Sequence, residues 1–142
     1  MIVSACLAGT ACRYDGTACP DPELMALVRA GKAWPVCPEC LGGLPTPRTA
    51  CELTGTGQQV LDGNARVLDC NGEDRTAAFL NGANKTLEIA RSRGASVAVL
   101  KGRSPSCGCG AVYDGTFSGR LVPGDGVTAA LLKRHGLRVE QR

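Results

Sequence analysis

The sequence contains no long apolar run and no segment typical of an export signal. No stretch reaches the roughly 18 consecutive apolar residues that a membrane-spanning helix needs, which excludes that class of helix. The first residues, MIVSACLAGTACRYDG, have neither a basic start nor an extended apolar stretch, so they do not resemble a secretory signal peptide. We therefore expect a cytoplasmic protein with no membrane partner.

Aromatic side chains and net charge are also scarce. The chain has one Trp, two Tyr and two Phe, which gives little support to a stacking platform for single-stranded RNA as a stand-alone binding module. Sixteen Lys and Arg against 13 Asp and Glu leave a net charge of +3. This mildly basic balance permits a phosphate-bearing partner without requiring one.

The chain has the length and composition of one ordinary domain. Its 142 residues, of which 44% are hydrophobic and 20% charged, are sufficient for a buried interior and argue against disorder. No internal repeat is apparent along the sequence. We therefore expect a single globular domain over residues 1–142.

Nine cysteines are the strongest compositional signal. An odd number leaves at least one cysteine unpaired, and a disulfide framework is not expected in a reducing cytosol. Metal, cluster or thiol chemistry is therefore the leading hypothesis. Glycine and proline gather near Cys6, Cys37 and Cys107, which indicates shaped loops that approach a ligand closely.

Hydrophobic periodicity predicts alternating strands and helices. Short apolar runs predict strands at residues 2–5, 33–36, 96–100 and 137–139. Capping signals and helical spacing predict helices at residues 21–31, 76–93 and 125–135. Turn residues predict a hairpin over 60–68, and the segment 41–57 is expected to be a shaped loop. This order predicts an α/β fold with an open, largely parallel, Rossmann-like sheet covered by helices.

Three cysteines follow three of the predicted strands. Cys6 follows the first strand, Cys37 follows the second, and Cys107 lies in the loop after the third. In open parallel sheets the ligand crevice lies beyond the carboxyl ends of the strands. The three thiols are therefore predicted to converge on one edge of the sheet, among loops rich in Gly, Pro and Cys.

Each cysteine segment has a simpler interpretation when it is taken alone. Cys6 is explained as a small buried residue at a strand end, and LKGRSPSCGCG as a flexible basic turn. Cys37 and Cys40 have the spacing of a redox pair or of half a zinc site, which Cys107 and Cys109 could complete. Taken together, convergent thiolates need a cation to offset their mutual repulsion, which favours a metal ion or an iron–sulfur cluster.

Five segments of the chain stand out in order: SACLAGTACRYDG, VCPECLGGLPTPR, LKGRSPSCGCG, YDGTFSG and GDGVTAALLKRHG. Together they resemble a bacterial family long catalogued as a domain of unknown function, whose characterised members are thiouracil desulfidases of the TudS type. The resemblance extends nearly end to end and is to the short, single-domain form. It implies an oxygen-sensitive [4Fe-4S] cluster held by three cysteines, with a fourth iron free to take sulfur from a thiolated uracil.

The resemblance also assigns roles to positions in these motifs. It implies Cys6, Cys37 and Cys107 as metal ligands, Glu39 as the acid/base carboxylate, and Ser104 as a substrate-contacting or proton-relaying serine. Cys12, Cys40 and Cys109 lie outside that ligand set, although Cys40 or Cys109 could tune the cluster or substitute as a ligand. Neighbouring polar and basic side chains are expected to bind the substrate or its phosphate: Arg13, Arg48, Lys101, Arg103 and Ser106.

The implied reaction replaces a thiocarbonyl sulfur by oxygen. It needs a soft Lewis acid for the departing sulfide, an activated water and a proton source, and its net chemistry is a hydrolysis. The candidate substrates are thiouracil, a 4-thiouridine nucleotide and 4-thiouridine in tRNA, the last of which would make the protein a tRNA-modification enzyme. Two other classes stay open: a zinc-stabilised nucleotide- or RNA-binding module, and a Cys-x-x-Cys thiol redox protein. No obligate protein partner is evident.

Overall fold

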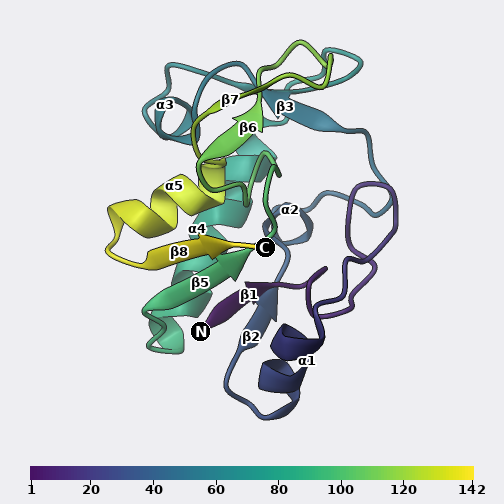
Figure 1. Cartoon of the computed structure of the whole chain (residues 1–142). Helices are drawn as coiled ribbons and strands as arrows, with labels where there is room; N and C mark the ends of the chain where they lie inside the picture. Colours follow the sequence, from purple (N-terminus) through teal and green to yellow (C-terminus); the bar gives the residue numbers. More distant parts are fainter.

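A four-stranded parallel sheet forms the centre of the computed structural model, which describes all residues from 1 to 142 (Figure 1). Its strands lie in the order β2 (Trp34–Val36), β1 (Ile2–Ser4), β5 (Val97–Leu100) and β8 (Arg138–Gln141). Every neighbouring pair in this sheet runs parallel. The predicted α/β class with a largely parallel sheet is therefore confirmed.

Helices and two small antiparallel sheets complete the fold. The helices are α1 (Pro22–Arg29), α2 (Pro38–Leu41), α3 (Gly57–Leu61), α4 (Thr76–Ser92) and α5 (Val127–Arg134). The small sheets pair β3 (Cys51–Leu53) with β4 (Val67–Asp69), and β6 (Ala111–Tyr113) with β7 (Leu121–Pro123). None of the helices has the length and apolar character needed to cross a membrane.

Helices cover both faces of the central sheet, and the alternation of side chains along each strand explains why. Ile2 and Leu100 belong to the larger core cluster, which includes buried residues of α4 and α5. Val3 and Val99 belong to the smaller cluster on the other face, with Leu24 of α1. Because successive strand residues point to opposite faces, each strand of the sheet centre is buried between two layers (Figure 1).

Two Asp side chains accept backbone N–H groups at the starts of helices, Asp21 as the N-cap of α1 and Asp74 one residue before the N-cap of α4. Asp21 Oδ1 accepts the backbone N–H groups of Glu23 and Leu24 at 3.0 and 3.3 Å, directly before α1. Asp74 Oδ1 accepts the backbone N–H of Thr76 at 2.8 Å, where α4 begins. Such side-chain acceptors satisfy N–H groups that the helix itself leaves free. The three predicted helices are confirmed, with ends that differ by a few residues.

The hairpin predicted over residues 60–68 is wrong. Residues 57–61 form α3, because Thr56 and Gln59 make a capping box at its start. The Gln59 N–H donates to Thr56 Oγ1 at 3.2 Å, and the Thr56 N–H donates to Gln59 Oε1 at 2.9 Å. Residues 67–69 do form a strand, but its partner β3 lies in the segment that was expected to be a loop.

The short helix α2 was also missed, although it positions part of the functional site. A Cβ atom at Gly82 of α4 would overlap the carbonyl oxygen of Pro38, and one at Gly42 would overlap the carbonyl oxygen of Ala78. The backbones of α2 and α4 are therefore in direct contact, which only glycine allows. The two glycines set the position of the helix that begins directly after Cys37.

Candidate active site

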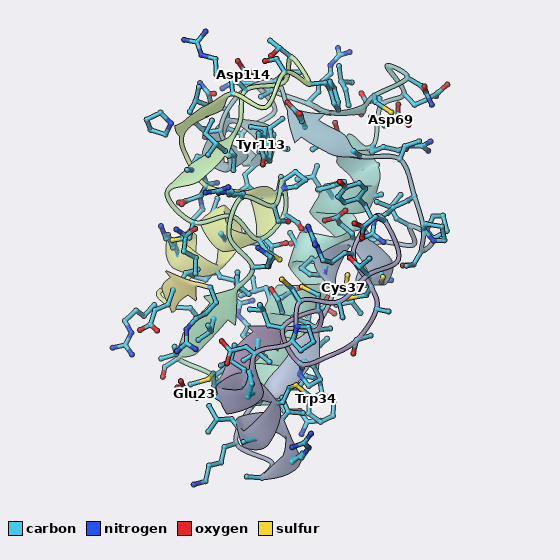
Figure 2. The ribbon with its side chains drawn as sticks, turned by 45° about the vertical axis from the view of Figure 1, so that its right-hand side comes forward. Glu23, Trp34, Cys37, Asp69, Tyr113 and Asp114 are labelled. Atoms are coloured by element: carbon cyan, nitrogen blue, oxygen red, sulfur yellow. The ribbon has the colours of Figure 1, made fainter.

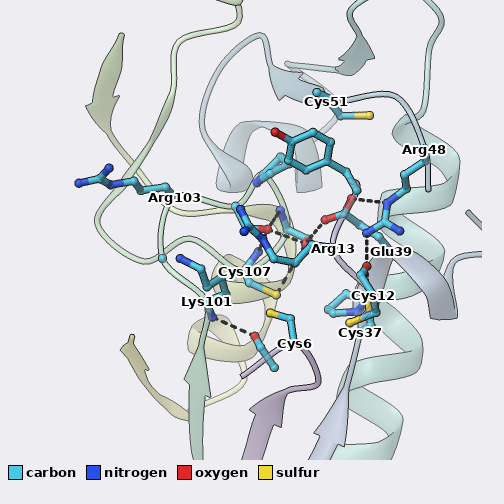
Figure 3. A pocket seen from close by; sticks show the side chains of 18 of the residues that line it. Cys6, Cys12, Arg13, Cys37, Glu39, Arg48, Cys51, Lys101, Arg103 and Cys107 are labelled. Atoms are coloured by element: carbon cyan, nitrogen blue, oxygen red, sulfur yellow. Dashed lines mark hydrogen bonds and ion pairs between the residues drawn. The ribbon is translucent and has the colours of Figure 1, made fainter. Parts of the chain in front are cut away.

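A pocket of about 470 Å³ lies beyond the carboxyl ends of β1, β2 and β5 (Figure 3). Cys6, Cys37 and Cys107 all line it, as the order of the strands predicts. At the same ends of the strands, the backbone N–H of Lys101 donates to Ser4 Oγ at 2.9 Å and so joins the end of β5 to the end of β1. The topology of the sheet thus gathers three thiols that are far apart in sequence.

A fourth thiol, that of Cys12, lowers the pKa values of two of these cysteines. Cys12 is buried, and its thiol lies within hydrogen-bonding reach of both Cys6 and Cys37. Its hydrogen bond lowers the pKa of Cys37 to about 6 and also lowers the pKa of Cys6, because it stabilises a thiolate. The pKa of Cys12 itself is raised by the same contacts, since it acts as the proton donor.

Cys107 has the opposite electrostatic environment. It is 4% exposed, and burial raises the pKa of its thiol to about 12. A desolvated thiol of this kind ionises when a cation binds beside it, because a coordinated metal stabilises the thiolate. The pocket therefore presents two thiols whose pKa values are lowered and one that would ionise on binding a cationic group.

Glu39 and two serines form a hydrogen-bonded chain beside the thiols. The Ser106 hydroxyl donates to Glu39 Oε2 at 2.9 Å, and its oxygen lies 3.0 Å from Ser104 Oγ. Ser104 Oγ also accepts the backbone N–H groups of Ser106 and Cys107 at 3.2 and 3.1 Å, which shapes the loop that carries Cys107. This chain gives a proton a path between the carboxylate and the pocket wall.

Arg48 provides the countercharge of Glu39 and has no free nitrogen for a substrate. Its Nε donates to Glu39 Oε1 at 3.0 Å, and its Nη2 donates to the carbonyl oxygen of Cys12 at 2.9 Å. Its Nη1 donates to Pro45 O and Thr46 Oγ1 at 3.1 and 3.0 Å. Its side chain is only 5% exposed. These contacts position Glu39 and the Cys12 loop, and Arg48 also lines the pocket, so its expected role in substrate binding stays a prediction.

Three other cations line the pocket without a protein partner. Arg13, Lys101 and Arg103 form no salt bridge and no side-chain hydrogen bond (Figure 3). Arg103 also has a φ of 67°, in the left-handed region that costs a bulky residue free energy. Unpaired cations beside a pocket suit an anionic group such as a phosphate.

Cys40 and Cys109 lie outside the pocket. Cys40 is exposed and within hydrogen-bonding reach of Cys37, while the Sγ of Cys109 lies 3.7 Å from the carbonyl oxygen of Val139. The two cysteine pairs considered for a zinc site are therefore not gathered in the pocket, since of their members only Cys37 and Cys107 line it.

The pocket also contains residues that the sequence analysis did not single out. Two belong to β3, Cys51 and Glu52, and three are aromatic, Tyr14, Tyr113 and Phe117. The sequence does carry a signal for the tyrosines, since Tyr-Asp-Gly-Thr occurs at residues 14–17 and again at 113–116. This repeat was missed because it is far shorter than a unit of fold.

The chain is similar to known proteins over its whole length. A family model described as 2-thiouracil desulfurase matches residues 1–142. The protein YbbK of Bacillus subtilis (strain 168) is 49% identical over 140 residues, which cover 98% of this chain and 93% of YbbK. A solved structure of the [4Fe-4S]-dependent thiouracil desulfidase TudS matches with a TM-score of 0.89 and 42% identity, covering 100% of this chain and 89% of that chain. The chain therefore belongs to the 2-thiouracil desulfurase family.

Proposed function

We propose that residues 1–142 act as a single desulfidase domain that uses a [4Fe-4S] cluster to replace the thiocarbonyl sulfur of a thiolated uracil by oxygen. The observation that carries this proposal is the placement of three thiols and the Glu39–Ser106 pair in one pocket. The reaction balances as a hydrolysis: the thiocarbonyl compound and water give the carbonyl compound and hydrogen sulfide. No electron is transferred.

The donor set of the pocket fits such a cluster. Cys6, Cys37 and Cys107 would hold three of its irons, because thiolates are the ligands that iron–sulfur clusters take. The lowered pKa values of Cys6 and Cys37 favour the thiolate forms, and the buried Cys107 would gain the cation it needs to ionise. When bound, the cluster would supply a soft Lewis acid for the departing sulfur at the iron without a protein ligand.

The residues of the chain would supply the proton transfers. Glu39 would act as the general acid/base, taking a proton from the attacking water and returning it to the departing sulfur or the ring. Ser106 would hold Glu39 Oε2 in place, and Ser104 would extend the chain toward the substrate. Arg48 would keep the carboxylate oriented, since its Nε donates to the other oxygen.

The three unpaired cations favour a substrate that carries phosphate. A volume of about 470 Å³ lies within the range of small-molecule sites, so a mononucleotide can be accommodated. Lys101, Arg103 and Arg13 would bind its phosphate, whereas the free base would leave them unpaired. We therefore place a 4-thiouridine mononucleotide first, and thiouracil and 4-thiouridine in tRNA as the other two substrates to compare.

Anaerobic reconstitution followed by an assay of sulfide release tests the proposal. The protein is expected to be brown, to contain iron and acid-labile sulfide, and to convert thiouracil or 4-thiouridine monophosphate to the oxygen analogue. Thiolated tRNA, assayed in parallel, determines whether the activity extends to RNA. A colourless protein that holds one zinc ion and releases no sulfide from any of the three compounds would overturn the proposal.

A further inference from the structure

The aromatic residues of the chain are concentrated at the pocket. Tyr14, Tyr113 and Phe117 line it, whereas Phe79 is in the core and Trp34 lies on the edge strand β2. Figure 2 shows Tyr113 and Trp34 on opposite sides of Cys37. In a chain with so few aromatic side chains, this distribution indicates that the aromatic rings at the pocket contact a ligand.

Two copies of one turn present the tyrosines. In residues 14–17 and 113–116, the Asp carboxylate accepts both the backbone N–H and the hydroxyl of the Thr that follows two residues later. The glycine of each copy has a positive φ, 77° at Gly16 and 91° at Gly115, a conformation that favours glycine. The same local structure therefore follows each tyrosine, Tyr14 in the loop after Cys12 and Tyr113 at the end of β6, and both reach the pocket from segments that are far apart in sequence.

Phe117 is held at the pocket in a backbone conformation that costs free energy. Its φ is 56°, which bulky residues rarely adopt. Glu52 of β3 offsets the free-energy cost of this conformation, because its Oε1 accepts the backbone N–H groups of Gly115 and Phe117 at 2.9 and 3.1 Å. Phe117 is still 39% exposed and Tyr14 is 44% exposed. A strained turn that keeps an aromatic ring exposed at a pocket points to a ligand for that ring.

We propose that Tyr14, Tyr113 and Phe117 form an aromatic frame that holds the faces of a conjugated pyrimidine ring, with Glu52 as the positioning residue of Phe117. This inference rests on the proposed function, since it takes a thiolated uracil as the ligand. A flat conjugated ring stacks on aromatic side chains through its faces, whatever groups its edges carry. The frame therefore selects planar thiopyrimidines over saturated or acyclic thiocarbonyl compounds, while the thiols and Glu39 act on the edge that carries the sulfur.

Calorimetry on the cluster-loaded protein tests the frame without turnover. Uracil and 5,6-dihydrouracil have the same carbonyl and N–H edges, but the dihydro compound lacks the C5–C6 double bond and its ring is puckered. The wild-type protein is expected to bind uracil about fivefold to a hundredfold more tightly. Tyr14→Leu and Phe117→Leu keep an apolar side chain and remove the ring, so each is expected to lose most of this preference. In assays with thiouracil, both variants are expected to raise KM and to leave kcat nearly unchanged.

Three further variants serve as controls. Trp34→Leu removes an exposed aromatic ring away from the pocket and is expected to leave the preference unchanged. Glu52→Ala is expected to reduce the preference although Phe117 is present, and Glu52→Gln, which keeps an oxygen acceptor, is expected to restore it. Tyr14→Phe is expected to bind like the wild type, because the ring and not the hydroxyl makes the contact.

Two results would overturn the aromatic frame: equal affinity of the wild type for the two compounds, or a preference for uracil that survives in both leucine variants. Tyr14 and Phe117 are exposed, so these variants are expected to keep the thermal midpoint of the wild type. Failure of the proposed function has a different signature, since the loaded protein would then release no sulfide from thiouracil or 4-thiouridine monophosphate, whatever its preference between the two rings.

Discussion

The hydroxyl of Ser106 donates to Glu39 Oε2 at 2.9 Å, across 67 residues of sequence. This contact joins the loop that carries Cys107 to the helix that begins after Cys37, so the proposed acid/base group is connected to two of the proposed ligand segments. The other carboxylate oxygen of Glu39 is bound by Arg48. A Gln side chain at this position keeps an oxygen acceptor for Arg48 and an N–H that can donate to Ser106 Oγ, so Glu39→Gln can separate the proton chemistry from the binding of the cluster.

Replacement of Glu39 by Gln keeps the shape of the side chain and removes its titratable group. Turnover of thiouracil is expected to fall by about a hundred- to ten-thousandfold, the usual contribution of a general acid/base. Iron content and the visible spectrum of the reconstituted protein are expected to match the wild type. Near-normal turnover would reduce Glu39 to a structural role.

Replacement of Cys6, Cys37 or Cys107 by Ala is expected to reduce the iron content of the reconstituted protein sharply, because each change removes one of the proposed thiolate ligands. Iron and acid-labile sulfide analysis measures the effect. Cys19→Ala and Cys70→Ala are the matched controls, since neither residue lines the pocket, and both are expected to keep full iron content. Full iron content in Cys37→Ala would contradict the assignment of Cys37 as a ligand of the cluster and would point to Cys40 as the replacement ligand.

Replacement of Cys40 by Ala distinguishes the proposed cluster-dependent desulfidase from a redox protein that uses the thiols of Cys37 and Cys40. Cys40 is exposed and close to Cys37, so a dithiol mechanism would require it. Under the proposed function, the variant is expected to release sulfide from thiouracil at the wild-type rate. A protein that retains its cluster and loses activity would favour the redox alternative.

The affinity for a phosphate-bearing substrate is expected to depend on salt. With 4-thiouridine monophosphate as the substrate, KM is expected to rise with ionic strength, while with neutral thiouracil it stays nearly constant. The double replacement of Lys101 and Arg103 by Gln is expected to raise the nucleotide KM about tenfold or more, because hydrogen bonds to charged groups are lost.

Lys32→Gln, an exposed lysine outside the pocket, is the control for that experiment. A nucleotide KM that is independent of both salt and the two cations would instead indicate recognition of the free base. A steep salt dependence for tRNA alone would indicate that cations outside the pocket contact several phosphates.

Replacement of Gly82 by Ala tests the contact between α2 and α4. Alanine favours a helix over glycine by about 1 kcal/mol, so an uncrowded site would be stabilised. Here the added methyl group would overlap the Pro38 carbonyl oxygen, and we expect a net destabilisation of about 1–3 kcal/mol together with weaker iron retention. Thermal unfolding and iron analysis measure both effects, with Lys85→Ala on the exposed face of α4 as the control.

The sequence was sufficient to predict the central sheet and the meeting of the three cysteines. Strands such as 96–100 are continuous apolar runs, and parallel order alone places the residues after them at one edge. The prediction failed at residues 57–61, where the Asp-Gly-Asn turn signal at 62–64 was given more weight than the Thr56–Gln59 capping box. The four-residue helix α2 and the pairing of β3 with β4 depend on tertiary contacts, which short segments do not reveal.

In the candidate site, too, residues that share a short motif could be predicted, whereas contacts between distant segments could not. Cys37 and Glu39 could be singled out because they share a motif, but the partners of Arg48 come from three separate segments. The sequence therefore indicates a basic residue near the motif, but it does not reveal that all three nitrogens of this side chain donate to groups within the protein. Glu52 was missed because its two N–H donors lie more than 60 residues away.

The contacts of Arg48 have a consequence for how the pocket moves. One buried side chain holds the Cys12 carbonyl, the Glu39 carboxylate and the segment at Pro45 and Thr46. Local opening of any one of these segments would leave a donor of this buried guanidinium without its acceptor, which costs free energy. We therefore expect the loop that carries Cys12 and α2 to open together, so that amide hydrogen exchange in both segments would report a similar free energy of opening.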